Sequence, residues 1–274
     1  MSLANATRSE LTKQFTTSMW WILGIVLFVY VGLTAGGLAG TFGALASGAL
    51  PSGMSNTPAL PAETLPPIIY SIATAVGYVF PLLIGTILVT GEFRHKTLTP
   101  TFLATPRRGV ALTGKVVAGA VMGVLYGALA IVAAVGLGAA LLAVFGVDTQ
   151  LGRGDTWAMI GRMAIAFVLW VLVGIGVGTL VRNQIAAVVG VIAFTQFLEP
   201  ILRTVGAFVD GVSGITRLLP GSASDALVGA SIYTGMGAQS GDALPWWAGG
   251  LLLLGYAVVF LVVGWLVSWR RDVS

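Results

Sequence analysis

The sequence contains no cysteine, a single histidine and few charged residues. Without cysteine the chain can form no disulfide and carries no thiolate chemistry. Only 9% of its residues are charged, whereas soluble domains carry about 25%, which argues against a water-soluble fold. Hydrolytic and metal chemistry find no support either, because His95 stands between Arg94 and Lys96, where a cation would be repelled.

Apolar residues are abundant: 57% of the chain is hydrophobic, and 38 residues are glycine. A span needs about 20 apolar residues to cross roughly 30 Å of hydrocarbon. The apolar runs are continuous rather than alternating, which favours helices over a barrel. The sequence therefore predicts an all-α integral membrane protein with six spans. They are Trp20–Ala39, Ile68–Thr90, Val116–Val144, Trp157–Val181, Ile185–Leu198 and Trp246–Trp269.

The fifth predicted span is too short to cross upright as an unbroken helix. It runs into Glu199-Pro200 and a second short apolar piece, Ile201–Val209. One interpretation is a helix that turns back partway and is buried against its neighbours. The other is a tilted span followed by a surface helix. Residues 199–244 are assigned to this extracellular or re-entrant segment.

The basic residues indicate how the chain is oriented. With the N-terminus in the cytoplasm, ten of the 14 lysines and arginines lie inside and four outside, which the positive-inside rule favours. Both termini are then cytoplasmic, as six spans require. Residues 6–18 are predicted to form an amphipathic helix on the membrane surface, with Leu11 and Phe15 on one face. A cleaved signal peptide is disfavoured because the uncharged run from Met19 continues past Ala46.

Glycines recur at four-residue spacing in three spans, which predicts close helix contacts within the chain or between subunits. These are Gly32-Gly36-Gly40, Gly119-Gly123-Gly127 and Gly174-Gly178. Pro81, midway along the second span, is predicted to free the carbonyl of Gly77 and to kink the helix. Gly109 to Lys115 has P-loop spacing, but Val116 replaces the hydroxyl residue that would hold Mg²⁺.

Ionisable residues are scarce inside the predicted spans. No carboxylate pair lies within one, which disfavours an ion-coupled carrier. Arg162 lies about one turn inside the fourth span and can extend outward. Glu199, at the outer end of the fifth, is four residues from Arg203 and can pair with it on one helix. Structural roles are favoured for both.

The loop at residues 91–109 is basic but too apolar for a plain solvated linker. Phe93, Leu98, Phe102 and Leu103 are interleaved with its charged residues. Such a segment can lie on anionic lipid headgroups or insert into a groove on a partner protein. Composition alone leaves both open.

The same loop carries a family resemblance. The pattern Glu92, Thr97-Leu98, Leu103, Thr105-Pro106 and Lys115 resembles the loop after the second span of type-2 ABC export permeases, most closely actinobacterial members. The layout is also similar, with a surface helix, six spans and a broken fifth span. Lys96 stands where many members have glycine.

The resemblance implies one permease domain, residues 1–274, whose loop forms a coupling helix that binds a cleft of a separate ATPase subunit. Two permease and two ATPase subunits would form the working unit, with ATP and Mg²⁺ on the ATPase and no cofactor on this chain. The residues assigned to the ATPase contact are Glu92, Phe93, Arg94, Thr97, Phe102 and Leu103. Those assigned to a substrate pathway between the permease subunits are Tyr78, Phe80, Gln196 and Phe197.

The leading hypothesis is thus the transmembrane subunit of an ATP-driven exporter for a hydrophobic or amphipathic compound. Its expected location is the plasma (inner) membrane. Its expected partners are an ABC ATPase, a second permease subunit and membrane lipid, with no nucleic acid. The alternative is a non-transport scaffold or sensor whose basic loop rests on lipid.

Overall fold

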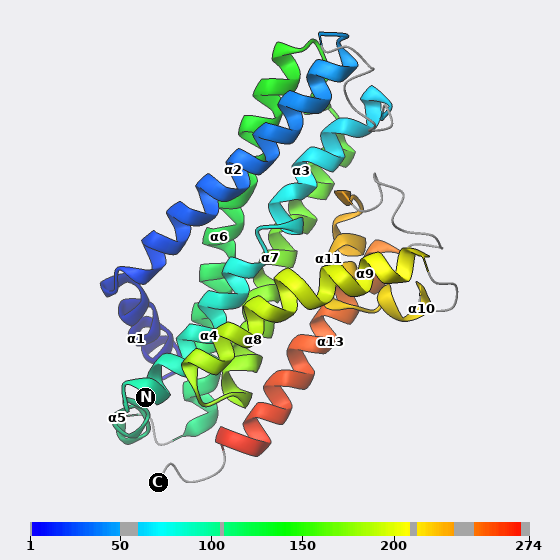
Figure 1. The fold of residues 1–274 in the computed structure, drawn as a ribbon. Helices are drawn as coiled ribbons and strands as arrows, with labels where there is room; N and C mark the ends of the chain where they lie inside the picture. The colour runs from blue at the N-terminus through cyan, green and yellow to red at the C-terminus, as the bar shows by residue number, and fades with distance from the viewer. Residues whose placement is uncertain (1, 50–59, 105–106, 209–212, 233–243, 270–274) are drawn as a thin grey trace.

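The computed structural model describes residues 2–49, 60–104, 107–208, 213–232 and 244–269. Figure 1 shows a helical bundle in which α1 and α5 lie at one end and the far ends of α2 and α6 at the other. The first half contains α1 (Leu3–Thr16), α2 (Met19–Ala46), α3 (Leu65–Ala75), α4 (Val79–Arg94), α5 (Leu98–Ala104) and α6 (Arg108–Val144). The second half contains α7 (Gly154–Leu180), α8 (Gln184–Ala193), α9 (Glu199–Phe208), α10 (Ser213–Thr216), α11 (Pro220–Val228) and α13 (Trp246–Gly264).

Six helical stretches are long and apolar enough to cross a membrane, which confirms the predicted all-α integral membrane fold. The stretches extend beyond the predicted spans at most ends, because the helices continue into polar residues that a hydropathy pattern leaves out. They are Met19–Ala46, Ala62–Arg94, Arg108–Val144, Gly154–Leu180, Gln184–Gly206 and Trp246–Val267. The surface helix α1 likewise begins three residues before the predicted residue 6.

The second span is broken where Pro81 predicts a kink. Helix α3 ends at Ala75 and α4 begins at Val79. Because Pro81 has no N–H, the carbonyl of Gly77 lacks its helical partner and accepts from the N–H of Phe80 at 3.2 Å instead. The span therefore consists of two helical rods joined at residues 76–78.

The glycine spacing identifies close contacts inside the subunit. A Cβ on Gly123 of α6 would lie 2.7 Å from the Cα of Val168 in α7, and one on Gly178 of α7 would lie 2.7 Å from the carbonyl oxygen of Thr86 in α4. Along α2, the side chain of Leu137 packs against Gly32, whereas a Cβ on Gly40 would meet nothing within 4 Å. Intramolecular packing thus explains the third and fourth spans, and the first in part.

The fifth span does not end at Leu198, which corrects the predicted boundary. A π-helix, Phe194–Leu198, joins α8 to α9 in one helical run. In this wider turn the N–H of Glu199 bonds to the carbonyl of Phe194, so the helix accommodates Pro200, which has no N–H to donate. The run is long enough to cross a bilayer, and residues 199–206 belong to it.

The chain after the fifth span turns back into the bundle. Helix α11 begins with Pro220 at its first position and ends at Gly229, whose φ of 85° closes the helix in the left-handed region. Most of its residues are buried, and it packs against α13, α7 and α3. Helix α11 is thus a buried helix within residues 199–244 that the apolar pattern did not reveal.

Candidate functional site at the α5 end of the bundle

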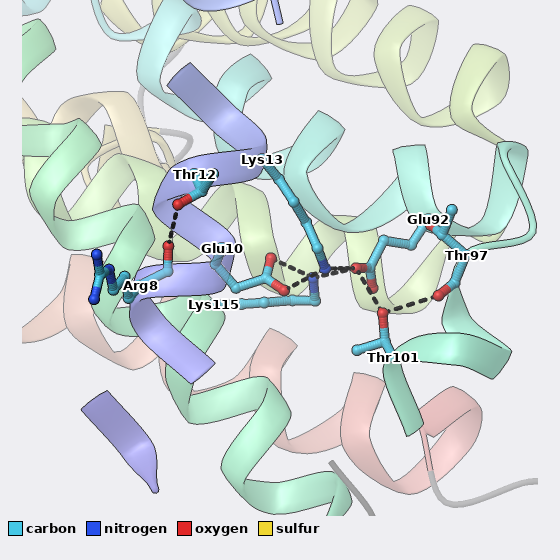
Figure 2. Close-up of polar contacts among 8 residues, drawn as sticks. All are labelled: Arg8, Glu10, Thr12, Lys13, Glu92, Thr97, Thr101 and Lys115. Atoms are coloured by element: carbon cyan, nitrogen blue, oxygen red, sulfur yellow. Dashed lines mark hydrogen bonds and ion pairs between the residues drawn. The ribbon is translucent and has the colours of Figure 1, made fainter. Parts of the chain in front are cut away.

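Four charged side chains from three helices meet near α5, and we refer to them as the ionic quartet (Figure 2). Helix α1 supplies Glu10 and Lys13, α4 supplies Glu92, and α6 supplies Lys115. The Lys13 Nζ lies 2.8 Å from Glu10 Oε1 and 2.9 Å from Glu92 Oε1. The Lys115 Nζ lies 2.7 Å from Glu10 Oε2 and 2.9 Å from Glu92 Oε1. Each ammonium group therefore bridges both carboxylates.

Three members of the quartet are buried, and the charges of the four balance. The Lys115 side chain is 0% exposed, and those of Glu10 and Glu92 are 6% and 7% exposed. Two positive and two negative charges leave no net charge in a site that water scarcely reaches. Removing one partner of a buried ion pair costs about 3–5 kcal/mol, because the remaining charge is left uncompensated.

Lys13 is the most accessible member of the quartet. Burial alone would lower the pKa of its ammonium group, but the hydrogen bonds and charges of Glu10 and Glu92 outweigh burial and raise that pKa above its ordinary value of 10.5. Lys13 therefore stays charged throughout the physiological pH range, and α1 stays tied to α4.

Small residues bring α1 close to α6. Ala6 and Glu10, four residues apart, form the buried face of α1. A Cβ on Gly114 would lie 3.1 Å from the Cβ of Ala6, so glycine allows the approach that places Lys115 beside Glu10. Arg8 and Thr12 are exposed, and Figure 2 shows Arg8 pointing away from the quartet.

A tight turn connects Glu92 directly to α5. Lys96 has a φ of 54°, in the left-handed region. The N–H of Thr97 donates to the carbonyl of Glu92 at 3.0 Å, and that of Lys96 to the carbonyl of Phe93 at 3.4 Å. This is the hydrogen-bond pattern of a Schellman cap, which glycine usually closes. Lys96 thus adopts the conformation for which many family members use glycine.

Among the side chains of α5 that the structure describes, that of Thr101 reaches the quartet. The Thr101 hydroxyl lies 3.3 Å from Glu92 Oε1, to which it can donate, and 2.8 Å from the carbonyl of Thr97 (Figure 2). Oε1 of Glu92 therefore contacts three donor groups, whereas its Oε2 has no partner among the described residues. The position of α5 is tied to the charges of α1, α4 and α6 through this one carboxylate.

The residues predicted to contact an ATPase differ in how far their side chains are exposed. Arg94 and Thr97 are exposed, and Leu103 is 79% exposed. Phe93 is partly buried against the core, and Glu92 points into the subunit. Phe102 belongs to α5, but its side chain lies outside the described residues.

The residues predicted to line a pathway fall into two groups. Tyr78 and Phe80 are buried. The Tyr78 hydroxyl donates to the carbonyl of Thr195 at 3.0 Å, which joins the break in the second span to the π-helix of the fifth. Phe80 instead faces α2, with its ring 6.2 Å from that of Tyr30. The last two, Gln196 and Phe197, are exposed on the fifth span.

Sequence reasoning did not assemble the quartet. Lys13 and Glu92 are 79 residues apart, and Glu10 and Lys115 are 105 apart, so no local spacing brings them together. The one available signal is Lys115 itself, a lysine that directly precedes the apolar run beginning at Val116. If such a residue is buried, it needs a carboxylate from another helix.

Comparison with known proteins places the chain in a family. No curated protein matches the sequence. The family model described as ABC-2 family transporter protein matches residues 4–273, nearly the whole chain. Proteins of this family are membrane subunits that normally work with an ABC ATPase and are not themselves catalytic. Together with its six membrane-spanning helices, this match shows that the chain belongs to the ABC-2 transporter family and is a multi-pass membrane subunit of an ABC transporter.

Proposed function

We propose that this chain is the permease of an ATP-driven exporter and that its α5 is the helix to which the ATPase subunit binds. The proposal rests on a difference in exposure between Leu103, in α5, and the side chains that hold α5 in place. Leu103 is 79% exposed, whereas Glu92 and Thr101 anchor the same segment to the quartet. A short helix that is held in place at one side and exposes an apolar side chain at the other can insert into a groove of a partner protein.

The anchoring gives α5 a mechanical connection to the rest of the subunit. From Glu92, α4 continues without interruption to Val79, next to the break at residues 76–78. There Tyr78 bonds to the fifth span through Thr195, and its ring lies 4.5 Å from that of Trp170 in α7. A movement of α5 would therefore reach the fifth and fourth spans through one rigid helix.

The fifth span is our proposed surface for a second permease subunit. It is an apolar helix whose side chains are largely uncovered within one subunit, among them Ile185, Val189, Phe197 and Ile201. A pathway between two subunits would then run beside Gln196 and Phe197. Tyr78 would act behind it, by holding the π-helix that presents these two residues.

The proposal requires α5 to lie in the cytoplasm, and the absence of cysteine permits a clean test. Leu103→Cys places a thiol in α5 and Ile215→Cys places one in α10, in side chains that are 79% and 68% exposed. We expect an impermeant thiol reagent to label Ile215→Cys in intact cells, and Leu103→Cys only after the membrane is opened. Labelling of Leu103→Cys in intact cells would overturn the orientation.

Docking is tested by Leu103→Asp in the complex purified from its source membrane. A charge at a central apolar contact costs about 2 kcal/mol or more, or roughly thirty-fold in affinity. We therefore expect the ATPase to be lost from the complex and ATP turnover to fall. The matched control is Ile215→Asp, a similarly exposed aliphatic residue in α10, which should keep both. If Leu103→Asp also keeps the ATPase and its turnover, α5 is not the docking helix.

A further inference from the structure

A second group of buried polar side chains joins α9 to α11, and we refer to Glu199, Arg203, Asp225 and Ser231 as the α9–α11 cluster. Arg203 forms an ion pair with Asp225, in place of the predicted pair with Glu199. The hydroxyl of Ser231 lies 2.5 Å from Asp225 Oδ2 and can donate to it. The backbone N–H of Gly221 donates to Glu199 Oε1 at 2.5 Å. All four side chains are at most 9% exposed.

The two oxygens of the Glu199 carboxyl group are in different situations. Oε1 accepts from Gly221, and the N–H of Ser222 at the start of α11 also faces the group. Oε2 is buried and has no hydrogen-bond partner among the described residues. The residue is 1% exposed, so bulk water does not reach this oxygen. An ionised carboxylate with one bare oxygen is unfavourable in such a place.

The charges of the α9–α11 cluster do not balance. Two carboxyl groups share one guanidinium group, so one positive charge is missing if both acids are ionised. Tyr256 of α13 also faces Glu199 and adds no positive charge. Arg162 of α7 lies over the ring of Trp246, 5.9 Å from its centroid, and beside Gly229. By sequence, residues 209–212 and 233–243 contain no lysine or arginine to supply the charge.

We propose that Glu199 is a proton-binding site of this subunit and that its Oε2 carries a proton in the conformation described. A proton neutralises the carboxyl group, needs no additional volume and leaves Oε1 free to accept from Gly221. The N-terminus of α11 favours a negative charge, but this effect is small beside the cost of removing an uncompensated carboxylate from water. Asp225 is not the site, because Arg203 and Ser231 both contact its carboxylate.

The proton controls the contact between α9 and α11. When Glu199 loses it, two carboxylates and one guanidinium remain in the cluster, and repulsion from Asp225 opposes the approach of α11. Since α11 also packs on α13 and α7, its release would loosen this side of the bundle. The native state binds a proton that the unfolded chain releases near neutral pH, so stability falls as the pH rises.

The test is infrared spectroscopy of the full chain in membranes, combined with thermal unfolding between about pH 5 and pH 9. We expect a carbonyl stretch from a protonated carboxyl group at neutral pH, which Glu199→Gln removes. Glutamine keeps the shape and the bond from Gly221, so this variant should fold and lose the decline in stability at higher pH. The exposed Glu63 serves as the control, since Glu63→Gln should change neither measurement.

A second variant separates proton binding from a merely structural role. Asp225→Asn removes the competing negative charge, so Arg203 then balances an ionised Glu199. We expect the protonated-carboxyl signal to disappear at neutral pH although Glu199 is still present. If the signal persists in Glu199→Gln, is absent from the natural chain, or is unchanged in Asp225→Asn, the proton-binding site is refuted. Each measurement is made on the permease without its ATPase, so its result is independent of whether α5 is the docking helix.

Discussion

The ionic quartet and the α9–α11 cluster both join helices that are distant in sequence, and both are largely removed from water. In the quartet, two lysines face two glutamates, so the site carries no net charge and each ammonium group contacts both carboxylates. In the α9–α11 cluster, two acids face one arginine. The balanced group suits a permanent joint beside α5. The unbalanced group needs a proton. The stability of the contact between α9 and α11 therefore depends on pH in a range that leaves the quartet unchanged.

The largest expected effect comes from unbalancing the quartet. Lys115→Met leaves Lys13 to serve two buried carboxylates, and we expect the free energy of unfolding to fall by about 3–5 kcal/mol. The measurement is denaturant unfolding in detergent. The double variant Glu10→Gln, Lys115→Met restores neutrality and should recover part of the loss. Equal stability of the single and double variants would show that charge balance is not what matters.

A steric change tests the α9–α11 cluster without altering any charge. Gly221 lies so close to the Glu199 carboxyl group that an added Cβ would overlap it. We expect Gly221→Ala to separate α9 from α11 and to cost about 1–3 kcal/mol, the usual cost of overpacking. Gly214→Ala is the control, because its Cβ would meet nothing within 4 Å. Unfolding measurements should place Gly214→Ala near the natural chain.

The turn between Glu92 and α5 offers a change in the opposite direction. Lys96 is held at a φ of 54°, and glycine avoids a strain of about 1 kcal/mol there. We expect Lys96→Gly to make the α5 segment more stable, as read by slower amide hydrogen exchange around Thr97. Lys96→Ala removes the same charge but keeps the strain, so it should give no such protection. Equal protection in both variants would assign the effect to charge.

The smallest expected effect is the response of the quartet to pH. Because the pKa of Lys13 is raised above 10.5 in the folded chain, its contribution to stability is complete below that value. It is lost only as the pH rises through the folded-state pKa. Measured in the Glu199→Gln background, the unfolding midpoint should be flat from about pH 6 to pH 9. A slope in that window would contradict this prediction.

The features that local sequence determines were predictable. Continuous apolar runs located the six spans, and Pro81 indicated the kink because a missing N–H always frees the carbonyl four residues earlier. The glycine spacing indicated which faces of α6 and α7 come into contact, since side chains four residues apart share a face. The resemblance in the loop after the second span identified the family.

What sequence reasoning missed depends on contacts between distant residues or on weak local signals. By sequence alone, the four residues of the quartet resemble ordinary charged residues at the ends of helices. Only the folded structure shows that they lie together. Glu199 was paired with Arg203 by spacing, but Arg203 forms its ion pair with Asp225, which α11 supplies from another part of the chain. Pro220 and Gly229 stand at the ends of α11, but sequence reasoning did not use them, and the small and polar residues between them give no apolar run. The fifth span was cut short at Pro200 because a π-helix is not visible in the hydropathy pattern.

The break at residues 76–78 gives α4 a hinge at Tyr78, about which the helix can tilt as a rigid body. Its 16 residues span about 24 Å at a rise of about 1.5 Å per residue. A tilt of about 5° around the hinge would therefore carry the far end of the helix, with α5 attached, through roughly 2 Å. Helix α3, on the other side of the hinge, need not rotate with it. Such a tilt would reach the fifth span through the hydrogen bond between Tyr78 and Thr195, while α3 keeps its place.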